Sequence, residues 1–280
     1  MDHALAQSAW LCKAPPWEGQ PATGAESHSK KRKVDKTITE AESTLVGKLA
    51  SRFARRLRKI GWRRLVSEVR GASNITEGVA QIPHPTARLL HHLRERGASV
   101  PLSMAPWSRE HCDQAMERDP HQSLHGEREF VAQELLDFCE QGYWIVVLPY
   151  RVAVDLFPGL RVSPLGVVPQ RERRPRLIVD YTFSGINAET LPWAAREAMQ
   201  FGRASLQRVF TTLVHAHPKY GPVHLAKIDV ADGFYRVWLQ MADIPKLGVA
   251  LPTAPNADPL VALPLVLPMG WVESPHTLQH

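Results

Sequence analysis

The residues best suited to chemistry lie in the segment 227–239, KIDVADGFYRVWL. Alternating apolar residues lead into Asp229, and a short turn with Asp232 and Gly233 separates them from a second apolar stretch. A carboxylate at the end of a buried strand points in a fixed direction, and Mg²⁺ binds one or two carboxylates together with substrate phosphates. The segment indicates either a magnesium site or an ordinary hairpin, because Asp-Gly between two apolar runs is also a common turn signal.

A second segment, residues 163–181, gathers positive charge at one point. Two apolar runs flank a stretch that contains Arg171, Arg173, Arg174 and Arg176, which predicts a β-hairpin with guanidinium groups at its tip. Planar guanidinium groups bind phosphate oxygens through paired hydrogen bonds. The hairpin is therefore suited to a polyanion, although a basic tip is often only solvated.

The third segment, LPMGWVESP at residues 267–275, interrupts an apolar run with Pro268 and Gly270 and then opens a helix at Ser274 and Pro275. Glycine permits backbone to approach a ligand closely, and proline is favoured in the first turn of a helix. Taken alone, the segment is equally typical of a plain strand-to-helix turn.

In this order, the three segments resemble the reverse transcriptases of retroviruses and retrotransposons. The resemblance covers residues 126–280 and is strongest in RPRLIVDY, KIDVADGFYRVWL and LPMGWVESP. It implies an α+β fold, namely the fingers and the first part of the palm of a right-hand polymerase. It also implies RNA-directed DNA polymerase activity, with an RNA or DNA template-primer and deoxynucleoside triphosphates as partners and Mg²⁺ as the cofactor.

The resemblance also assigns roles to two residues at the hairpin and two in the loop. Arg176 matches the arginine that contacts the triphosphate, and Arg171 carries a charge near the position of the family's lysine. Gly270 and Trp271 match the loop beneath the nucleotide and the template. Met269 stands where retroviral members usually have glutamine.

The central segment receives the catalytic roles. Asp229 matches the first palm aspartate, a ligand of both magnesium ions in the two-metal scheme. Asp232 and Gly233 match the turn that cradles the triphosphate. Phe234 matches the aromatic gate that crowds a ribose 2′-hydroxyl and so favours deoxynucleotides.

The chain departs from the family after the third segment. The family's next motif supplies further magnesium ligands through an Asp-Asp pair, and these 280 residues contain no adjacent pair of aspartates. One carboxylate cannot hold two divalent ions against their mutual repulsion. We therefore expect a truncated family member that is inactive by itself. The alternative is a decayed or domesticated retroelement remnant that only binds nucleic acid, and the third reading is an unrelated α+β protein.

The elements around these segments fit an α+β fold, because helical and strand patterns mix without a regular βαβ rhythm. Helices are expected at residues 43–69, 86–96, 127–141 and 194–210. Strands are expected at residues 143–150, 162–168, 176–181, 223–230, 234–239, 247–251 and 260–267. The domains predicted are a disordered basic tail at 1–42, a helical region of unknown role at 43–125, and the partial polymerase domain at 126–280.

Clusters of basic residues lie in the first two of these regions. The net charge of +6 favours an acidic partner. In the tail, Lys30, Lys31, Arg32 and Lys33 resemble a nuclear import signal or form a solvated charge run. The helix at 43–69 carries seven Arg and Lys residues between 52 and 64. It is suited to nucleic acid or an anionic membrane, or it is a surface helix whose apolar face packs on the core.

Composition limits the remaining possibilities. The three cysteines lie far apart and suggest no disulfide framework. The sequence shows no secretory signal and no apolar run long enough to cross a membrane. We expect an intracellular protein, nuclear if the basic cluster acts as an import signal and cytoplasmic otherwise. The sequence does not predict an oligomeric state.

Overall fold

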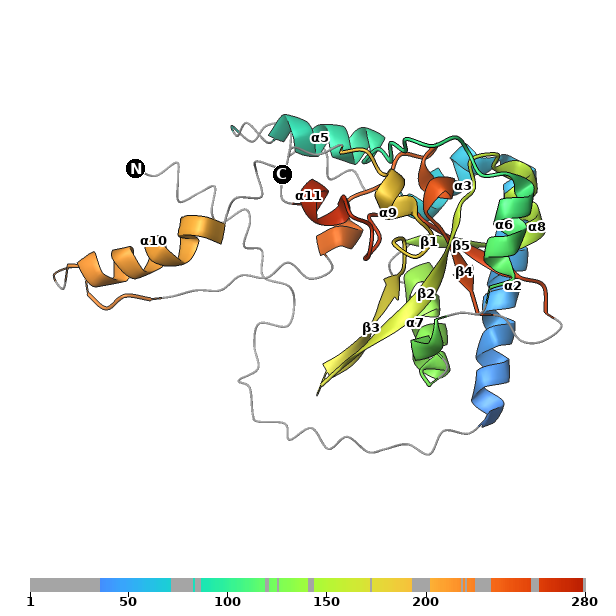
Figure 1. Ribbon diagram of the computed structural model, residues 1–280, viewed down its shortest axis with the longest axis horizontal. Coiled ribbons are helices and arrows are strands. Elements are labelled where there is room, and N and C mark those ends of the chain that lie inside the picture. The colour runs from blue at the N-terminus through green and yellow to red at the C-terminus, as the bar shows by residue number, and fades with distance from the viewer. Residues whose placement is uncertain are drawn as a thin grey trace. The chain divides into compact units, whose positions relative to one another are not determined.

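Five strands form one mixed sheet in the order β1-β5-β4-β2-β3 (Figure 1). Their bounds are β1 Ile145–Pro149, β2 Val162–Gln170, β3 Arg173–Val179, β4 Gly248–Leu251 and β5 Leu260–Pro264. The pairs β1–β5, β4–β5 and β2–β3 are antiparallel, and β2–β4 is parallel. The computed structural model describes residues 36–71, 83, 87–118, 121–124, 126–140, 144–171, 173–192, 202–217, 219, 221–224, 233–252 and 257–278.

Strands β1 and β5 are buried on both faces. Successive side chains of a strand point to opposite faces of the sheet. Accordingly, Val146 and Leu148 of β1 join one apolar cluster, while Ile145 and Val147 join the other. Burial on both faces explains why β1 and β5 read as continuous apolar runs rather than alternating ones.

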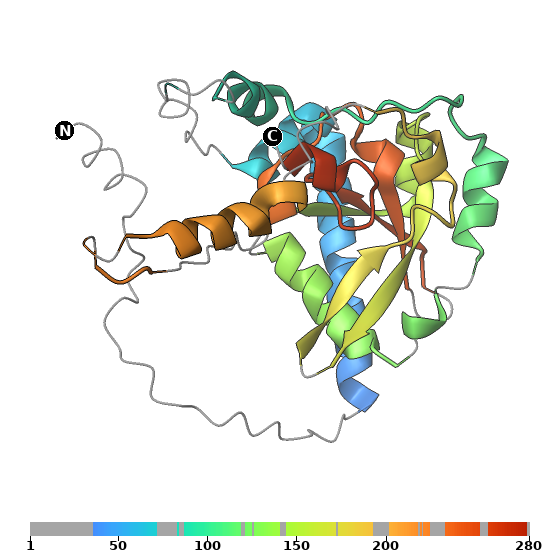
Figure 2. The same cartoon turned by 60° about the vertical axis from the view of Figure 1, so that its left-hand side comes forward.

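Two helices pack against the sheet. Helix α2 (Lys36–Ile60) packs against β1 and α7 (Arg128–Glu140), and the views agree that α2 and α7 run beside the strands (Figures 1 and 2). Val46 and Ala50 of α2 meet Leu135 of α7 in the cluster that also contains Val147 of β1. This packing supports the interpretation of α2 as a surface helix with an apolar face on the core.

The described residues contain further helices and 3₁₀ turns. They are α3 Trp62–Arg70, α5 Ala87–Arg96, α6 Arg109–Met116, α8 Tyr150–Leu156, α9 Ile186–Glu189, α10 Gly202–His215 and α11 Ser274–Leu278, with 3₁₀ turns η1 Gln122–Leu124, η4 Gly233–Arg236 and η5 Ile244–Leu247. No helix in the described ranges combines the length and hydropathy that crossing a bilayer requires. Cys112 and Cys139 are buried, and neither forms a disulfide among the described residues.

Two predicted elements differ from the structure. The single helix expected at 43–69 is two helices that meet at Gly61, whose φ of 79° interrupts the helical path. The strand expected at 234–239 begins instead as the 3₁₀ turn η4. The ring of Tyr235 in that turn lies 4.2 Å from the ring of Trp144, so aromatic packing favours the turn over an extended strand.

Most other predicted elements are confirmed, with shifted ends, whereas the strand expected at 223–230 lies largely outside the described residues. The helix expected at 86–96 is α5, and it ends where predicted, at Gly97 with φ 82°. The antiparallel hairpin and the helix that opens at Ser274 are also present. Helix α2 begins at Lys36, earlier than expected. The import candidate Lys30–Lys31–Arg32–Lys33 lies outside the described residues.

Candidate functional site

The β2–β3 hairpin carries the predicted phosphate-binding arginines. The pairing runs from Leu165 opposite Val179 to Gln170 opposite Arg173, with Arg171 in the turn. Arg176 of β3 stands opposite Val168 of β2. The hairpin extends beyond the ends of the other strands (Figure 1), which holds its basic end away from the core.

The structure separates the tip arginines into two kinds. Arg174 forms an ion pair with Glu134 of α7, lies 3.6 Å from the Asp137 carboxylate, and stacks over the Phe130 ring at 5.5 Å. Arg171 and Arg176 are exposed, and among the described residues neither side chain forms a hydrogen bond or an ion pair. These two guanidinium groups therefore remain able to bind an anion, whereas Arg174 fixes β3 to α7.

The base of the hairpin is in direct contact with the loop around Gly270. The Val179 backbone N–H donates to the Met269 carbonyl at 3.2 Å. Gly270 has φ 108°, and a Cβ at this position would lie 2.1 Å from the Val179 carbonyl oxygen. Only glycine meets both requirements, because L-residues avoid this φ and no side-chain atom fits at that distance.

Asn187 holds the same loop from the other side. Its Nδ2 donates to the Gly270 carbonyl at 3.0 Å, and its Oδ1 accepts from the Val272 N–H at 2.9 Å. The chain reaches α9 through a turn in which Asp180 Oδ1 accepts from the Phe183 N–H, a local bond typical of aspartate in turns. Our reading of the sequence missed Asn187, because a single asparagine after a turn carries no distinctive signal.

Two buried aromatic residues make this junction rigid. Trp271 is 1% exposed, and its Nε1 donates to Thr190 Oγ1 at 3.1 Å. The indole therefore belongs to the core, and any contact of residue 271 with a nucleotide would come from its backbone. Tyr181 is fully buried and donates its hydroxyl to the Leu247 carbonyl at 3.0 Å. Burial raises the pKa of Tyr181 well above its usual value, so its phenol stays protonated.

The described part of the central segment pairs with the residues that lead into the loop. The Leu239 N–H donates to the Leu265 carbonyl at 2.9 Å, and the Leu267 N–H donates to the Val237 carbonyl at 3.0 Å. Gly233 lies in η4, which lies beside α11. Phe234, in the same turn, is half-buried against the core.

The three segments are thus connected in series by backbone hydrogen bonds. Residues 237–239 pair with residues 265–267, and Met269 then pairs with Val179 at the end of the hairpin. Segments from three distant parts of the chain therefore meet at one junction. Asp229 and Asp232 lie outside the described residues, so the structure gives no distance between either carboxylate and Arg176.

The described residues offer little that would hold a metal ion. Within these ranges no group of three or more His, Cys, Asp or Glu side chains is arranged to do so. The predicted ligand Asp229 is not among them. Comparison of the chain with protein-family models and with curated proteins gives no significant match.

Proposed function

We propose that this chain is a reverse-transcriptase-type nucleotidyltransferase domain that binds a deoxynucleoside triphosphate at the junction of the hairpin, the Gly270 loop and η4. The proposal assigns the α+β fold to the fingers and the first part of a polymerase palm. The observation that carries it is the series of hydrogen bonds linking residues 237–239, 265–269 and Val179. A chance resemblance in three short segments gives no reason for them to meet.

In this proposal, Arg176 binds the triphosphate and Arg171 adds positive charge at the hairpin turn, since both guanidinium groups are exposed and face no carboxylate among the described residues. Gly270 brings backbone close to the nucleotide, and Asn187 fixes that backbone in place. Asp229 would hold Mg²⁺, which supplies charge neutralisation for phosphoryl transfer when bound. Phe234 would select deoxynucleotides by crowding a 2′-hydroxyl.

The second candidate is a protein that binds nucleic acid without catalysis. It needs only exposed cations, and Arg171, Arg176 and the basic face of α2 supply them. The two candidates differ in what Arg176 recognises. A nucleotidyltransferase binds a free triphosphate at this residue, whereas a nucleic-acid-binding protein recognises a phosphodiester backbone.

Binding of a fluorescent deoxynucleoside triphosphate in Mg²⁺ by the 280-residue polypeptide tests the proposal. An arginine–phosphate hydrogen bond contributes about 1.5–3 kcal/mol, so Arg176→Ala should weaken binding by about tenfold or more. The matched control is Arg128→Ala, which removes an exposed arginine from α7. This control should leave the affinity unchanged.

The competing result is equally specific. If Arg176→Ala weakens binding of a single-stranded oligonucleotide but the protein binds no triphosphate, the nucleic-acid-binding candidate is correct. If Arg176→Ala and Arg128→Ala behave alike towards both ligands, neither candidate describes this hairpin. Circular dichroism of each variant separates these outcomes from loss of the fold.

A further inference from the structure

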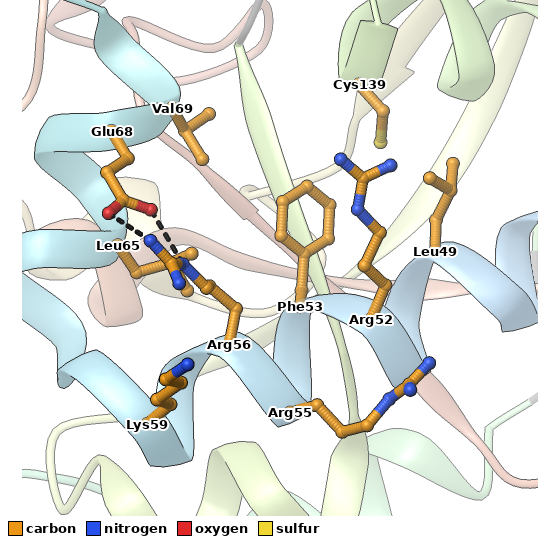
Figure 3. Close-up of a pocket in the computed structure, with 10 residues that line it drawn as sticks. All are labelled: Leu49, Arg52, Phe53, Arg55, Arg56, Lys59, Leu65, Glu68, Val69 and Cys139. Carbon is orange, nitrogen blue, oxygen red and sulfur yellow. Dashed lines mark hydrogen bonds and ion pairs between the residues drawn. The ribbon is translucent and has the colours of Figure 1, made fainter.

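A groove with an apolar floor lies between α2, α3 and the C-terminal part of α7 (Figure 3). Its volume is about 640 Å³. The floor is formed by Leu49 and Phe53 of α2, Leu65 and Val69 of α3, and Cys139 of α7. Leu49 and Phe53 are only half-buried, so apolar surface of α2 remains open to solvent here.

This groove face of α2 is distinct from the one that builds the core. Val46, Ala50, Ala54 and Leu57 are buried and pack against the sheet and α7. Leu49 and Phe53 continue the apolar surface sideways at helical spacing. Leu49 and Phe53 also pack against the core clusters, but they are only partly buried, so some of their apolar surface remains in the groove.

Four cations line the groove, and one of them is neutralised. Arg56 pairs with Glu68 of α3 through two bonds, of 2.9 and 2.5 Å (Figure 3). Arg52, Arg55 and Lys59 are exposed, and among the described residues none of their side chains forms a hydrogen bond or an ion pair. The groove therefore combines an apolar floor with an excess of positive charge at its edge.

We propose that this groove binds an acidic amphipathic helix of a partner protein. Such a helix places apolar side chains at i, i+3, i+4 and i+7 on the floor and carboxylates beside the exposed cations. Charge complementarity selects an acidic partner, and the floor selects peptide over nucleic acid. Bases bind to aromatic planes, whereas four of the five floor residues, Leu49, Leu65, Val69 and Cys139, are not aromatic.

The test uses a fluorescein-labelled peptide of about 18 residues, or roughly five helical turns. It carries Leu at the i, i+3, i+4 and i+7 positions and Glu and Ala elsewhere. A second peptide has Gln in place of every Leu, and an oligothymidylate of similar length provides the nucleic-acid arm. Fluorescence anisotropy measures binding to the 280-residue polypeptide and to two double variants.

Arg52→Glu/Lys59→Glu reverses charge at the groove, and Arg58→Glu/Lys48→Glu makes the same change at exposed positions of α2 that do not line it. We expect the groove variant to weaken binding of the Leu peptide by about tenfold and the control variant by less than about twofold. The Gln peptide should lose most of its binding. All four substituted side chains are exposed, so both variants should fold.

Three results would overturn the proposal. The first is the absence of binding by the Leu peptide, and the second is an equal loss of binding in the two variants. The third is displacement of the peptide by oligothymidylate, with the nucleic acid losing more affinity than the peptide in the groove variant. That last result would make the groove a nucleic-acid surface. None of these results depends on the hairpin, so the proposed nucleotide site would stand or fall separately.

Discussion

Gly270→Ala should destabilise the fold more than any other single-methyl addition at an exposed glycine. At φ 108°, an alanine is strained by about 1–3 kcal/mol. Its Cβ would also lie 2.1 Å from the Val179 carbonyl oxygen, so the loop must move by about 1 Å or more to reach ordinary contact. Such a movement breaks the Val179–Met269 bond and the Asn187–Gly270 bond, at about 1 kcal/mol each. The expected loss is about 3–5 kcal/mol.

Substitutions at two other glycines separate the effect of backbone strain from that of steric overlap. Gly185 has φ 80°, but a Cβ there meets nothing within 4 Å, so Gly185→Ala adds strain alone and should cost about 1–2 kcal/mol. Gly159 has neither a positive φ nor a near neighbour, and Gly159→Ala should change stability by less than about 1 kcal/mol. Urea unfolding followed by circular dichroism gives all three values.

Comparing the free energies of unfolding of Gly270→Ala and Gly185→Ala tests whether the overlap with Val179 exists. If the two variants lose the same free energy of unfolding, the overlap with Val179 does not exist, and the hairpin is not fixed to the loop. The proposed nucleotide site would then lose its structural basis. A larger loss for Gly270→Ala, by about 2 kcal/mol, is the result that the geometry requires.

Two further predictions concern buried polar groups. Arg161 is 2% exposed and binds Glu189 and the carbonyls of residues 104 and 105. Arg161→Met should therefore lower the free energy of unfolding, measured in urea, by about 3–5 kcal/mol. The control Arg151→Met, at an exposed ion pair, should lower it by less than about 1 kcal/mol. Because the pKa of Tyr181 is raised in the folded state, stability should fall as the pH rises above about 10, where the unfolded phenol ionises. Tyr181→Phe should flatten this decline in urea titrations between about pH 8 and pH 11, and an unchanged slope would contradict it.

Sequence patterns correctly predicted the elements whose formation depends mainly on residues close together in the chain. The hairpin was expected from two apolar runs around a charged stretch, and it is present, but its strands pair as far as Gln170 and Arg173. Backbone pairing does not require apolar side chains, so the charged tip is shorter than the charge pattern suggested. Gly97 was expected to end α5 for the same local reason, since glycine adopts the positive φ of a helix end.

Features that depend on distant residues could not be predicted in this way. Helix α8 was missed because Tyr150 continues the apolar run of β1, and only Pro149 marks the change. The turn at Phe234 forms because Tyr235 packs on Trp144, far earlier in the chain. Likewise, no pattern around Arg174 indicates that it pairs with α7 rather than with a ligand.

The anchoring of β3 bears directly on how Arg176 would recognise a phosphate. On one side of Arg176, the ion pair of Arg174 fixes the strand to α7. On the other side, the bond from Val179 to Met269 fixes it to the Gly270 loop, which Asn187 also holds in place. A side chain between two such anchors loses less freedom on binding, because its backbone is already ordered by folding. The backbone of Arg176 is therefore held at a constant distance from the loop, as recognition of one bound triphosphate by both elements would require.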